Sequence, residues 1–350
     1  MQIFSRNTLH LLPSKSSPLL RGILYFLLTI PLILLAIEIV ARTSLGQLLP
    51  APSVGADSFL FDAKIYALEQ QVRQDGGLDC LFIGSSVTNS DVDPAIVEQI
   101  YKERTGESIH CYNLGMPAMT VENATALADA VITRFHPKVI IYPVLSRDIS
   151  HLVATADFIE KSDWLKANRG EPSPNGWLVN HSYAYRYLLT WSYWLVTDNR
   201  AKMESEIKWL TPEGFQPAAG IRDPYPANLT MTPKRLAEVW ADPTRKPALE
   251  AFLALQKKGV RIVLVEGPVY RDPSVDPATI PSWQIYEEQY IAQFQQIADE
   301  NGVPFWRSDA IAIQIPKPQW YDWIHLNGEG AAPFSQWLGE QLAANAWLFK

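Results

Sequence analysis

Residues 81–94 have the sequence LFIGSSVTNSDVDP, and this stretch decides how the rest of the chain is interpreted. An apolar run, typical of a buried strand, breaks at a glycine and leads to two serines, Ser85 and Ser86. Asp93 is a favourable N-cap and Pro94 suits the first position of a helix. The pattern predicts a strand, a tight serine turn and a helix, with a hydroxyl exposed where the strand ends.

The same alternation of apolar runs and helical patterns continues after this stretch. Helical patterns separate most of the runs and also close the chain. Strand-like runs are expected at 78–85, 108–114, 138–145, 260–266 and 303–306, and helices at 94–105, 121–135, 247–257, 283–300 and 328–347. Such alternation favours right-handed crossovers between parallel strands. The expected fold class is therefore α/β, a doubly wound, flavodoxin-like parallel sheet of about five strands.

A long region, at about 148–246, interrupts the alternation within a domain expected to cover residues 78–350. Loops of this length in a compact domain are usually functional covers or added subdomains, so we interpret this region as an insertion. It is rich in tryptophan, tyrosine and proline, with one clear helical pattern at 184–197. Its aromatic residues either form the insertion's own small core, which we favour, or present a surface to a sugar or to a membrane interface.

The N-terminal part of the chain has the composition of a membrane anchor. Residues 22–40 are 19 nearly uncharged positions, which as a helix would span about 28 Å, close to the hydrocarbon thickness of a bilayer. Residues 1–21 contain basic but no acidic side chains, which places them in the cytoplasm and the main domain outside it. A cleaved signal peptide is the alternative, but its apolar core is usually only about 7–15 residues. Residues 41–77 are interpreted as a connector.

Composition narrows the class of function. The net charge of −7 gives no overall electrostatic reason to expect nucleic acid as a partner. No Cys/His spacing of the kind that holds a metal is present, and no cofactor is expected. Cys80 and Cys111 occupy comparable points of two strand-like runs. A disulfide between them is possible outside the cytoplasm, but we expect two buried thiols, because neighbouring strands often present cysteines in poor bridging geometry.

A serine nucleophile needs a base and a third group that orients the base, and one segment supplies both. Asp322 and His325 lie in a non-helical segment directly before the last helix. A turn with this spacing directs one carboxylate oxygen to the imidazole and leaves the other ring nitrogen facing outward. The order Ser, Asp, His along the chain is one of the known orders of such triads.

These blocks together resemble an SGNH/GDSL-type hydrolase, particularly its membrane-anchored relatives that work in O-acylation of cell-envelope polymers. The resemblance covers about residues 78–145 and 260–342. It implies that Ser86 is the nucleophile, His325 the base and Asp322 the group that orients it. It also implies that backbone N–H groups of Ser86 and Gly115 line the oxyanion hole. The blocks that carry it are Gly84-Ser85-Ser86, Asn113-Leu114-Gly115 and Asp322-Trp323-Ile324-His325-Leu326-Asn327.

One block departs from the family pattern. Where the family usually has Gly-x-Asn-Asp, residues 143–148 are PVLSRD, with no asparagine to donate an amide to the oxyanion. Arg147 or Ser146 is the expected substitute donor. Losing one such donor lowers rates by about 100-fold to 1000-fold. Asp148, Glu266 and Tyr270 follow strand ends and are expected to border the substrate, with loop anchoring as the alternative.

The sequence therefore predicts a membrane-anchored esterase or O-acyltransferase that forms an acyl-enzyme on Ser86. Its substrate is expected to be an acyl ester, in particular an acylated envelope polysaccharide, and a membrane acyltransferase is a possible partner. The lipid bilayer itself is expected to be a partner through residues 22–40. The alternative is a catalytically weak scaffold that binds a glycan or a partner protein.

Overall fold

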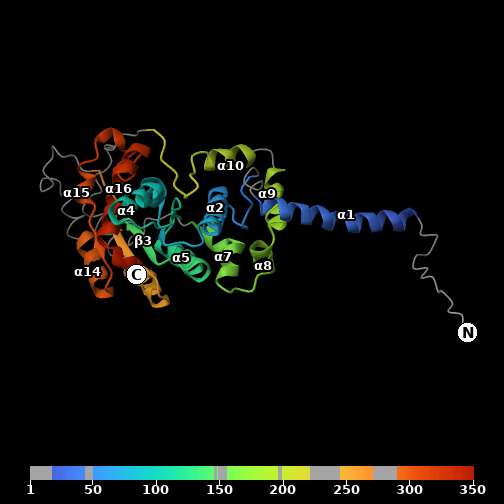
Figure 1. The fold of residues 1–350 in the computed structure, drawn as a ribbon, viewed down its shortest axis with the longest axis horizontal. Coiled ribbons are helices and arrows are strands. Elements are labelled where there is room, and N and C mark those ends of the chain that lie inside the picture. Colours follow the sequence, from blue (N-terminus) through green and yellow to red (C-terminus); the bar gives the residue numbers. More distant parts are fainter. Residues whose placement is uncertain are drawn as a thin grey trace, which may run out of the picture.

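The computed structural model describes residues 18–43, 50–145, 148, 156–195, 199–220, 245–270 and 290–350. Within them the chain forms one α/β domain, from which a single long helix, α1 (Pro18–Ala41), projects outward (Figure 1).

The centre of the domain is a five-stranded, all-parallel sheet, as predicted. Its order is β2-β1-β3-β4-β5, so the first strand in the chain lies inside the sheet and β2 lies at one edge. The chain therefore winds in both directions from β1, and the doubly wound prediction is confirmed. The strands are β1 (Cys80–Phe82), β2 (Cys111–Asn113), β3 (Val139–Val144), β4 (Arg261–Glu266) and β5 (Phe305–Trp306).

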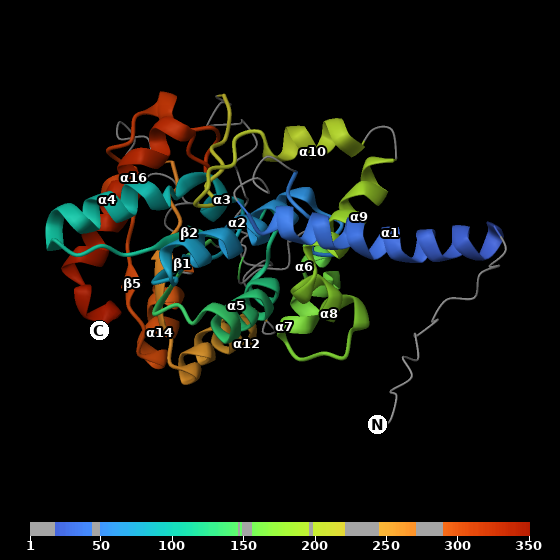
Figure 2. The same cartoon turned by 45° about the vertical axis from the view of Figure 1, so that its right-hand side comes forward.

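Alternate residues of the strands enter two separate hydrophobic cores, one on each face of the sheet. Leu81 packs in one core, whereas its neighbours Cys80 and Phe82 pack in the other. This follows from the two-residue period of a strand. The first core is covered by α2 (Phe59–Asp75), α5 (Val121–Phe135), α12 (Arg245–Leu253) and α14 (Ala292–Asn301), and the second by α4 (Pro94–Thr105) and α16 (Gly328–Ala344) (Figure 2).

The expectation of two free thiols was wrong, because Cys80 and Cys111 form a disulfide. The two residues lie directly opposite each other in the parallel register of β1 and β2, with their Cα atoms 4.5 Å apart. That separation falls in the range that a disulfide bridges without backbone movement. The bond joins the edge strand covalently to its neighbour.

The predicted connector, residues 41–77, contains α2, which packs into the first core through Phe61, Ile65 and Leu68. Ser58 caps the helix by accepting from the Phe61 N–H. The part of α1 from Arg21 to Ala41 is long and apolar enough to cross a membrane.

Five helices lie in the described part of the interrupting region, and its residues 208–220 form turns and irregular backbone. Its helices are α6 (Asp157–Lys161), α7 (Asp163–Asn168), α8 (Pro174–His181), α9 (Tyr183–Trp194) and α10 (Asn199–Ile207). Its described tryptophans differ in exposure: Trp164 is fully buried in the first core, Trp194 is half-buried, and Trp177, Trp191 and Trp209 are exposed. The remaining short helices are η3 (Ala254–Lys258), α15 (Asp309–Ala312), η6 (Lys317–Gln319) and η7 (Ala346–Phe349).

One buried carboxylate joins these helices to the rest of the domain. Glu69 of α2 accepts two hydrogen bonds from the Arg186 guanidinium of α9, at 2.6 and 3.0 Å. It also accepts from Arg134 of α5 at 2.9 Å and from the Trp164 indole of α7 at 3.1 Å. Burial acts to raise the pKa of Glu69, but Arg186 and Arg134 outweigh it and hold that pKa below its ordinary value.

Candidate active site

Ser86 is the first residue of a short helix, α3 (Ser86–Asp91), that follows β1 after a three-residue turn. The turn is tight: a Cβ on Gly84 would lie 2.3 Å from Thr88 Oγ1, so only glycine lets the chain approach α3 this closely. From Cys80 to Val92, Ser86 is the one residue that is not buried, and Ser85 is only 1% exposed. The structure thus distinguishes the two serines and presents the Ser86 hydroxyl.

The segment before α16 forms a compact loop that holds Asp322 and His325 in place. The His325 carbonyl accepts from the Tyr321 N–H at 2.8 Å, which closes the loop on itself. Asp322 Oδ1 accepts from the backbone N–H groups of Ile324 (3.0 Å) and His325 (2.9 Å). The Asp322 carboxylate is therefore oriented by its own loop, and it stays on the same side as the His325 ring.

The structure brings Ser86, His325 and Asp322 into one hydrogen-bonded chain, as their order in the sequence predicts. His325 Nε2 lies 2.8 Å from Ser86 Oγ, and His325 Nδ1 lies 2.8 and 2.9 Å from the two carboxylate oxygens of Asp322. With the Nδ1 proton donated to Asp322, Nε2 is left to accept the Ser86 proton. This arrangement can generate a nucleophilic serine oxygen.

The Asp322 carboxylate is suited to remain charged. Burial acts to raise its pKa, but the hydrogen bond and positive charge of His325, with the two backbone N–H groups, outweigh burial. The pKa of Asp322 therefore lies below its ordinary value. An ionised carboxylate here stabilises the imidazolium that forms when His325 takes a proton.

The two predicted backbone donors of the oxyanion hole, the N–H groups of Gly115 and Ser86, have different surroundings. The Gly115 N–H donates to the Asn113 side-chain oxygen at 2.9 Å, so this group is already engaged. The Asn113 side chain is fully buried, and its amide donates to the carbonyls of Thr88 and Val92, which fixes its oxygen in that position. Arg147 and Ser146 lie outside the described residues. Ser86 occupies the first turn of α3, where backbone N–H groups have no acceptor within the helix.

The loop after β2 contains a residue that the sequence analysis missed. Ala118 has a φ of 63°, a conformation that residues with a side chain rarely adopt. The Met116 N–H in the same loop donates to the Gly84 carbonyl at 2.9 Å, which holds the loop against the serine turn. Unusual backbone conformations of this kind cluster in active sites. Nothing in the sequence could have indicated it, because alanine carries no such signal.

Lys64 is a second missed residue, because it lies in the expected connector and lysine is rarely buried. Its side chain is fully buried, and Nζ donates to the carbonyls of Gly115 at 2.7 Å and Asn113 at 3.2 Å. Burial lowers the pKa of Lys64 well below its ordinary value. Lys64 thus fastens the loop after β2 to α2.

Asp91 is a third residue that the sequence analysis missed. It links α3, which begins with Ser86, to the loop that carries Asp322 and His325. It ends α3, and its Oδ1 accepts from the Leu326 N–H at 3.0 Å and from the Ser90 hydroxyl at 2.6 Å. Asp91 is fully buried, and burial, with a smaller contribution from the Asp322 charge, raises its pKa well above the ordinary value. The helix that begins with Ser86 is therefore tied to the residue that follows His325.

The residues expected to border the substrate serve as loop anchors in the structure. Asp148 accepts from the Leu145 N–H at 2.7 Å and from the Tyr142 hydroxyl at 3.2 Å. Glu266 is 1% exposed and accepts from Arg307 at 2.9 Å and from the Ser308 N–H at 3.0 Å.

Tyr270 is also buried, and it lies behind the histidine loop. Its N–H donates to the Trp323 carbonyl at 2.8 Å, and its ring packs edge-on against Trp320, with centroids 5.5 Å apart. These contacts match the anchoring alternative. Through these two contacts, Tyr270 helps to hold the loop that carries Asp322 and His325 in place.

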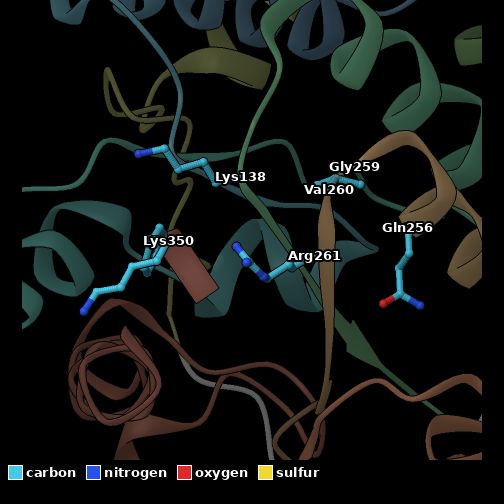
Figure 3. Close-up of a pocket in the computed structure, with 7 residues that line it drawn as sticks. Lys138, Gln256, Gly259, Val260, Arg261 and Lys350 are labelled. Atoms are coloured by element: carbon cyan, nitrogen blue, oxygen red, sulfur yellow. The ribbon is translucent and has the colours of Figure 1, made fainter. Parts of the chain in front are cut away.

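A hollow of about 460 Å³ lies elsewhere, at the opposite end of the sheet. Its lining includes Lys138, Arg261 and Lys350, and the first two stand at the amino ends of β3 and β4 (Figure 3). Ser86 follows the carboxyl end of β1, so the hollow is separate from the serine site. Lys138 is already paired with Asp79 at 2.9 Å. Within the described residues, no group of three or more His, Cys, Asp or Glu side chains could hold a metal ion.

No family model and no curated protein matches the chain. Solved structures do resemble it, at low identity. An acetylxylan esterase from Geobacillus stearothermophilus, solved as a catalytic mutant, is 15% identical with a TM-score of 0.40, covering 75% of this chain and 94% of that one. A psychrotrophic esterase from Pseudoalteromonas is 11% identical with a TM-score of 0.38, covering 78% and 99%. A lipase/acylhydrolase from Enterococcus faecalis is 12% identical with a TM-score of 0.35, covering 77% of this chain and 97% of that one.

The resemblance to SGNH/GDSL-type hydrolases rests on the sequence blocks, the five-stranded parallel sheet and the contacts among Ser86, His325 and Asp322.

Proposed function

We propose that the chain is a serine esterase or acyltransferase of SGNH type, with Ser86 as nucleophile, His325 as base and Asp322 as the group that orients the base. The observation that carries this proposal is the 2.8 Å contact between Ser86 Oγ and His325 Nε2, backed by Asp322 on the far side of the ring. Ser86 lies 239 positions before His325 in the chain, yet the two side chains meet in a geometry suited to proton transfer.

The reaction follows from these positions. Ser86 Oγ attacks the carbonyl carbon of an ester while its proton moves to His325 Nε2. The tetrahedral intermediate collapses, the alcohol leaves with the proton from His325, and an acyl-serine remains. Water, or the hydroxyl of an acceptor, then gives its proton to His325 and attacks the acyl-serine. The bond from the acyl carbon to Ser86 Oγ breaks, His325 returns the proton to Ser86 Oγ, and the acid or the new ester is released. Asp322 remains charged throughout and offsets the imidazolium.

The substrate class comes from the resemblance and not from the site contacts. The membrane-anchored relatives that the sequence blocks resemble suggest an acylated envelope polysaccharide, and α1 suggests a single-pass anchor with the domain outside the cytoplasm. A membrane acyltransferase would be a fitting donor partner for transfer.

A catalytically weak scaffold is the second candidate, favoured by one specific observation. The Gly115 N–H is bonded to Asn113, and the sequence of residues 143–148, which begins at the end of β3, contains no side-chain amide. On this alternative the oxyanion would be held too weakly for efficient turnover.

A fluorophosphonate probe, which reacts with activated serines, distinguishes the two candidates. The enzyme is expected to be labelled in the full-length wild type, and labelling is expected to be lost in Ser86→Ala. Ser85→Ala is the matched control and should keep the label, since Ser85 is buried. Absence of labelling in well-folded wild type, or labelling that survives in Ser86→Ala, would contradict the assignment.

A further inference from the structure

The carboxyl-terminal end of α1 is fixed to the domain. Ala41 is buried against Tyr183 and Tyr187 of α9. Glu38 accepts from the Ala184 N–H at 2.9 Å and from the Ser182 hydroxyl at 3.1 Å. The helix and the start of α9 therefore have a defined relation to each other, with apolar and polar contacts at the same place.

The uncharged part of α1 is too short to span a bilayer and also hold the domain at a distance from it. Arg21 and Glu38 bracket this part and are 17 residues apart. At the helical rise this is about 25 Å, less than the roughly 30 Å of a hydrocarbon core. A helix that spans the membrane between these charges must keep Glu38 at the outer boundary, together with the residues of α9 that bind it.

The outward face of α9 is apolar apart from Ser192, whose hydroxyl donates to the Leu189 carbonyl at 2.6 Å. Leu188 (46% exposed), Trp191 (38%) and the C-cap residue Leu195 (87%) are spaced by three and four residues and lie on one side of the helix, whereas Arg186 and Thr190 are buried on the other. In both views α9 crosses the end of α1, at the edge of the domain from which α1 leaves (Figures 1 and 2).

Charge and residue type on this face also suit a lipid surface. The only charged side chain in α9 is Arg186, which is buried and paired with Glu69. Trp177 of the neighbouring α8 is 60% exposed and stacks on the His181 ring. The His181 carbonyl accepts from Arg42, which follows α1, at 3.2 Å, and Trp177 lies one turn before His181 in α8. Tryptophan is enriched where protein meets the membrane–water boundary.

We propose that a membrane-seating face, made of Leu188, Trp191 and Leu195 of α9 with Trp177 of α8, lies in the headgroup region of the bilayer. The domain then contacts the membrane in one orientation and is not joined to its anchor by a flexible linker. The inference rests on the proposed spanning role of α1, and it adds a second, peripheral contact with lipid.

The test uses the full chain in phosphatidylcholine nanodiscs with an environment-sensitive fluorophore on single introduced cysteines, since both native cysteines are in the disulfide. Labels on Leu188→Cys and Leu195→Cys are expected to be quenched by lipids carrying a nitroxide high on the acyl chain. Ile30→Cys within α1 is the positive control. Lys102→Cys, exposed on α4 across the domain, should stay unquenched.

The outcomes separate the two proposals. Quenching at Ile30 without quenching at Leu188 and Leu195 overturns the seating face and leaves the anchor intact. No quenching at Ile30 overturns both, and fluorophosphonate labelling of the same samples reports the serine chemistry independently. Labels shielded from aqueous iodide but not quenched by lipid would indicate a second copy on this face, and would also overturn the proposal.

An attached fluorophore could itself insert into lipid and bring α9 with it. A second measurement therefore uses the protein's own tryptophans and no label. Brominated lipids quench nearby tryptophans, so the quenched fraction of intrinsic fluorescence should fall in the Trp177→Phe/Trp191→Phe double variant. Trp347→Phe removes an equally exposed tryptophan from the C-terminal end, remote from α1, and should leave the quenched fraction unchanged. Equal effects of the two changes would contradict the seating face.

Discussion

Asp91 offers a test of how the two halves of the site are held together. Replacing it with alanine removes the acceptor of the Leu326 N–H, the backbone group that follows His325. The Ser90 hydroxyl keeps another acceptor, the Ser86 carbonyl at 3.0 Å, so a single buried donor is left without a partner. The change thus isolates the link between α3 and the histidine loop.

The expected magnitude follows from that single loss. An unsatisfied buried N–H costs about 1–3 kcal/mol, which in a domain of this size lowers the midpoint of thermal unfolding by about 5 °C. The ester-cleaving rate should fall by about 10-fold to 100-fold, because a small displacement of His325 from Ser86 is enough to slow proton transfer. Asp91→Asn keeps the acceptor oxygen and should stay within about 1 kcal/mol of wild type.

The pH dependence has a definite sign. Burial raises the folded pKa of Asp91 above the ordinary 3.8, so the proton on this carboxyl stabilises the fold. That contribution is fully present below the pKa of the unfolded chain and is lost as the pH rises through the folded pKa. Asp91→Asn has no proton to lose, so its stability relative to wild type should increase from acidic to alkaline pH.

The midpoint of thermal unfolding is measured for wild type and both variants in detergent at several pH values, with tryptophan fluorescence as the readout. Hydrolysis of a nitrophenyl ester by the same samples measures the rate. The reasoning fails if Asp91→Ala keeps the midpoint and rate of wild type. It also fails if Asp91→Asn is as damaging as Asp91→Ala at acidic pH, because the neutral amide should replace the protonated carboxyl.

Three further predictions concern the site and the fold. Asp322→Asn should lower kcat/KM for an ester by about 10⁴-fold, because the amide no longer enforces the productive tautomer of the histidine. Arg186→Met should destabilise the protein by about 3–5 kcal/mol in denaturant unfolding, since Glu69 loses its main partner in a buried site; the Glu69→Leu/Arg186→Met double variant should lie closer to wild type. Replacing Cys80 and Cys111 together by alanine should lower stability by about 3–4 kcal/mol, given the 31-residue separation that the disulfide closes.

Each of these has a result that would contradict it. Asp157→Asn makes the same change at an exposed carboxylate, and an Asp322→Asn enzyme that matches it in rate would remove Asp322 from the catalytic chain. A double variant at Glu69 and Arg186 less stable than the single one would show that the ion pair is not the coupling between them. Unchanged stability on loss of the disulfide would mean that β1 and β2 are held by packing alone.

The sheet was predictable because each strand is an apolar run bounded by turn residues and separated by helical patterns. The short helix α3 was not, because six residues rich in Ser, Thr, Asn and Asp show no helical period. Its presence matters for the site, since it turns Ser86 from a loop residue into the start of a helix.

The contacts that surround the serine site depend on side-chain geometry that no pattern encodes. That Asn113 takes the Gly115 N–H, and that Lys64 supports the same loop, depends on how α2 packs against β2. The disulfide depends on the register of two parallel strands, which is set by packing around the crossover and not by the runs themselves. Ser86, Asp322 and His325 were accessible from sequence because their chemistry needs those residue types in that order.

The docking of α1 also decides where the chain can be shortened to obtain a water-soluble form. A cut at Gly77 would delete Lys64 and strip the carbonyls of Asn113 and Gly115 of their donor, so the protein must begin before α2. A cut near Ala51 keeps α2 but removes Ala41 from its place against the tyrosines of α9. Such a truncated protein would carry a newly bared aromatic surface, and we expect it to self-associate unless that surface is redesigned.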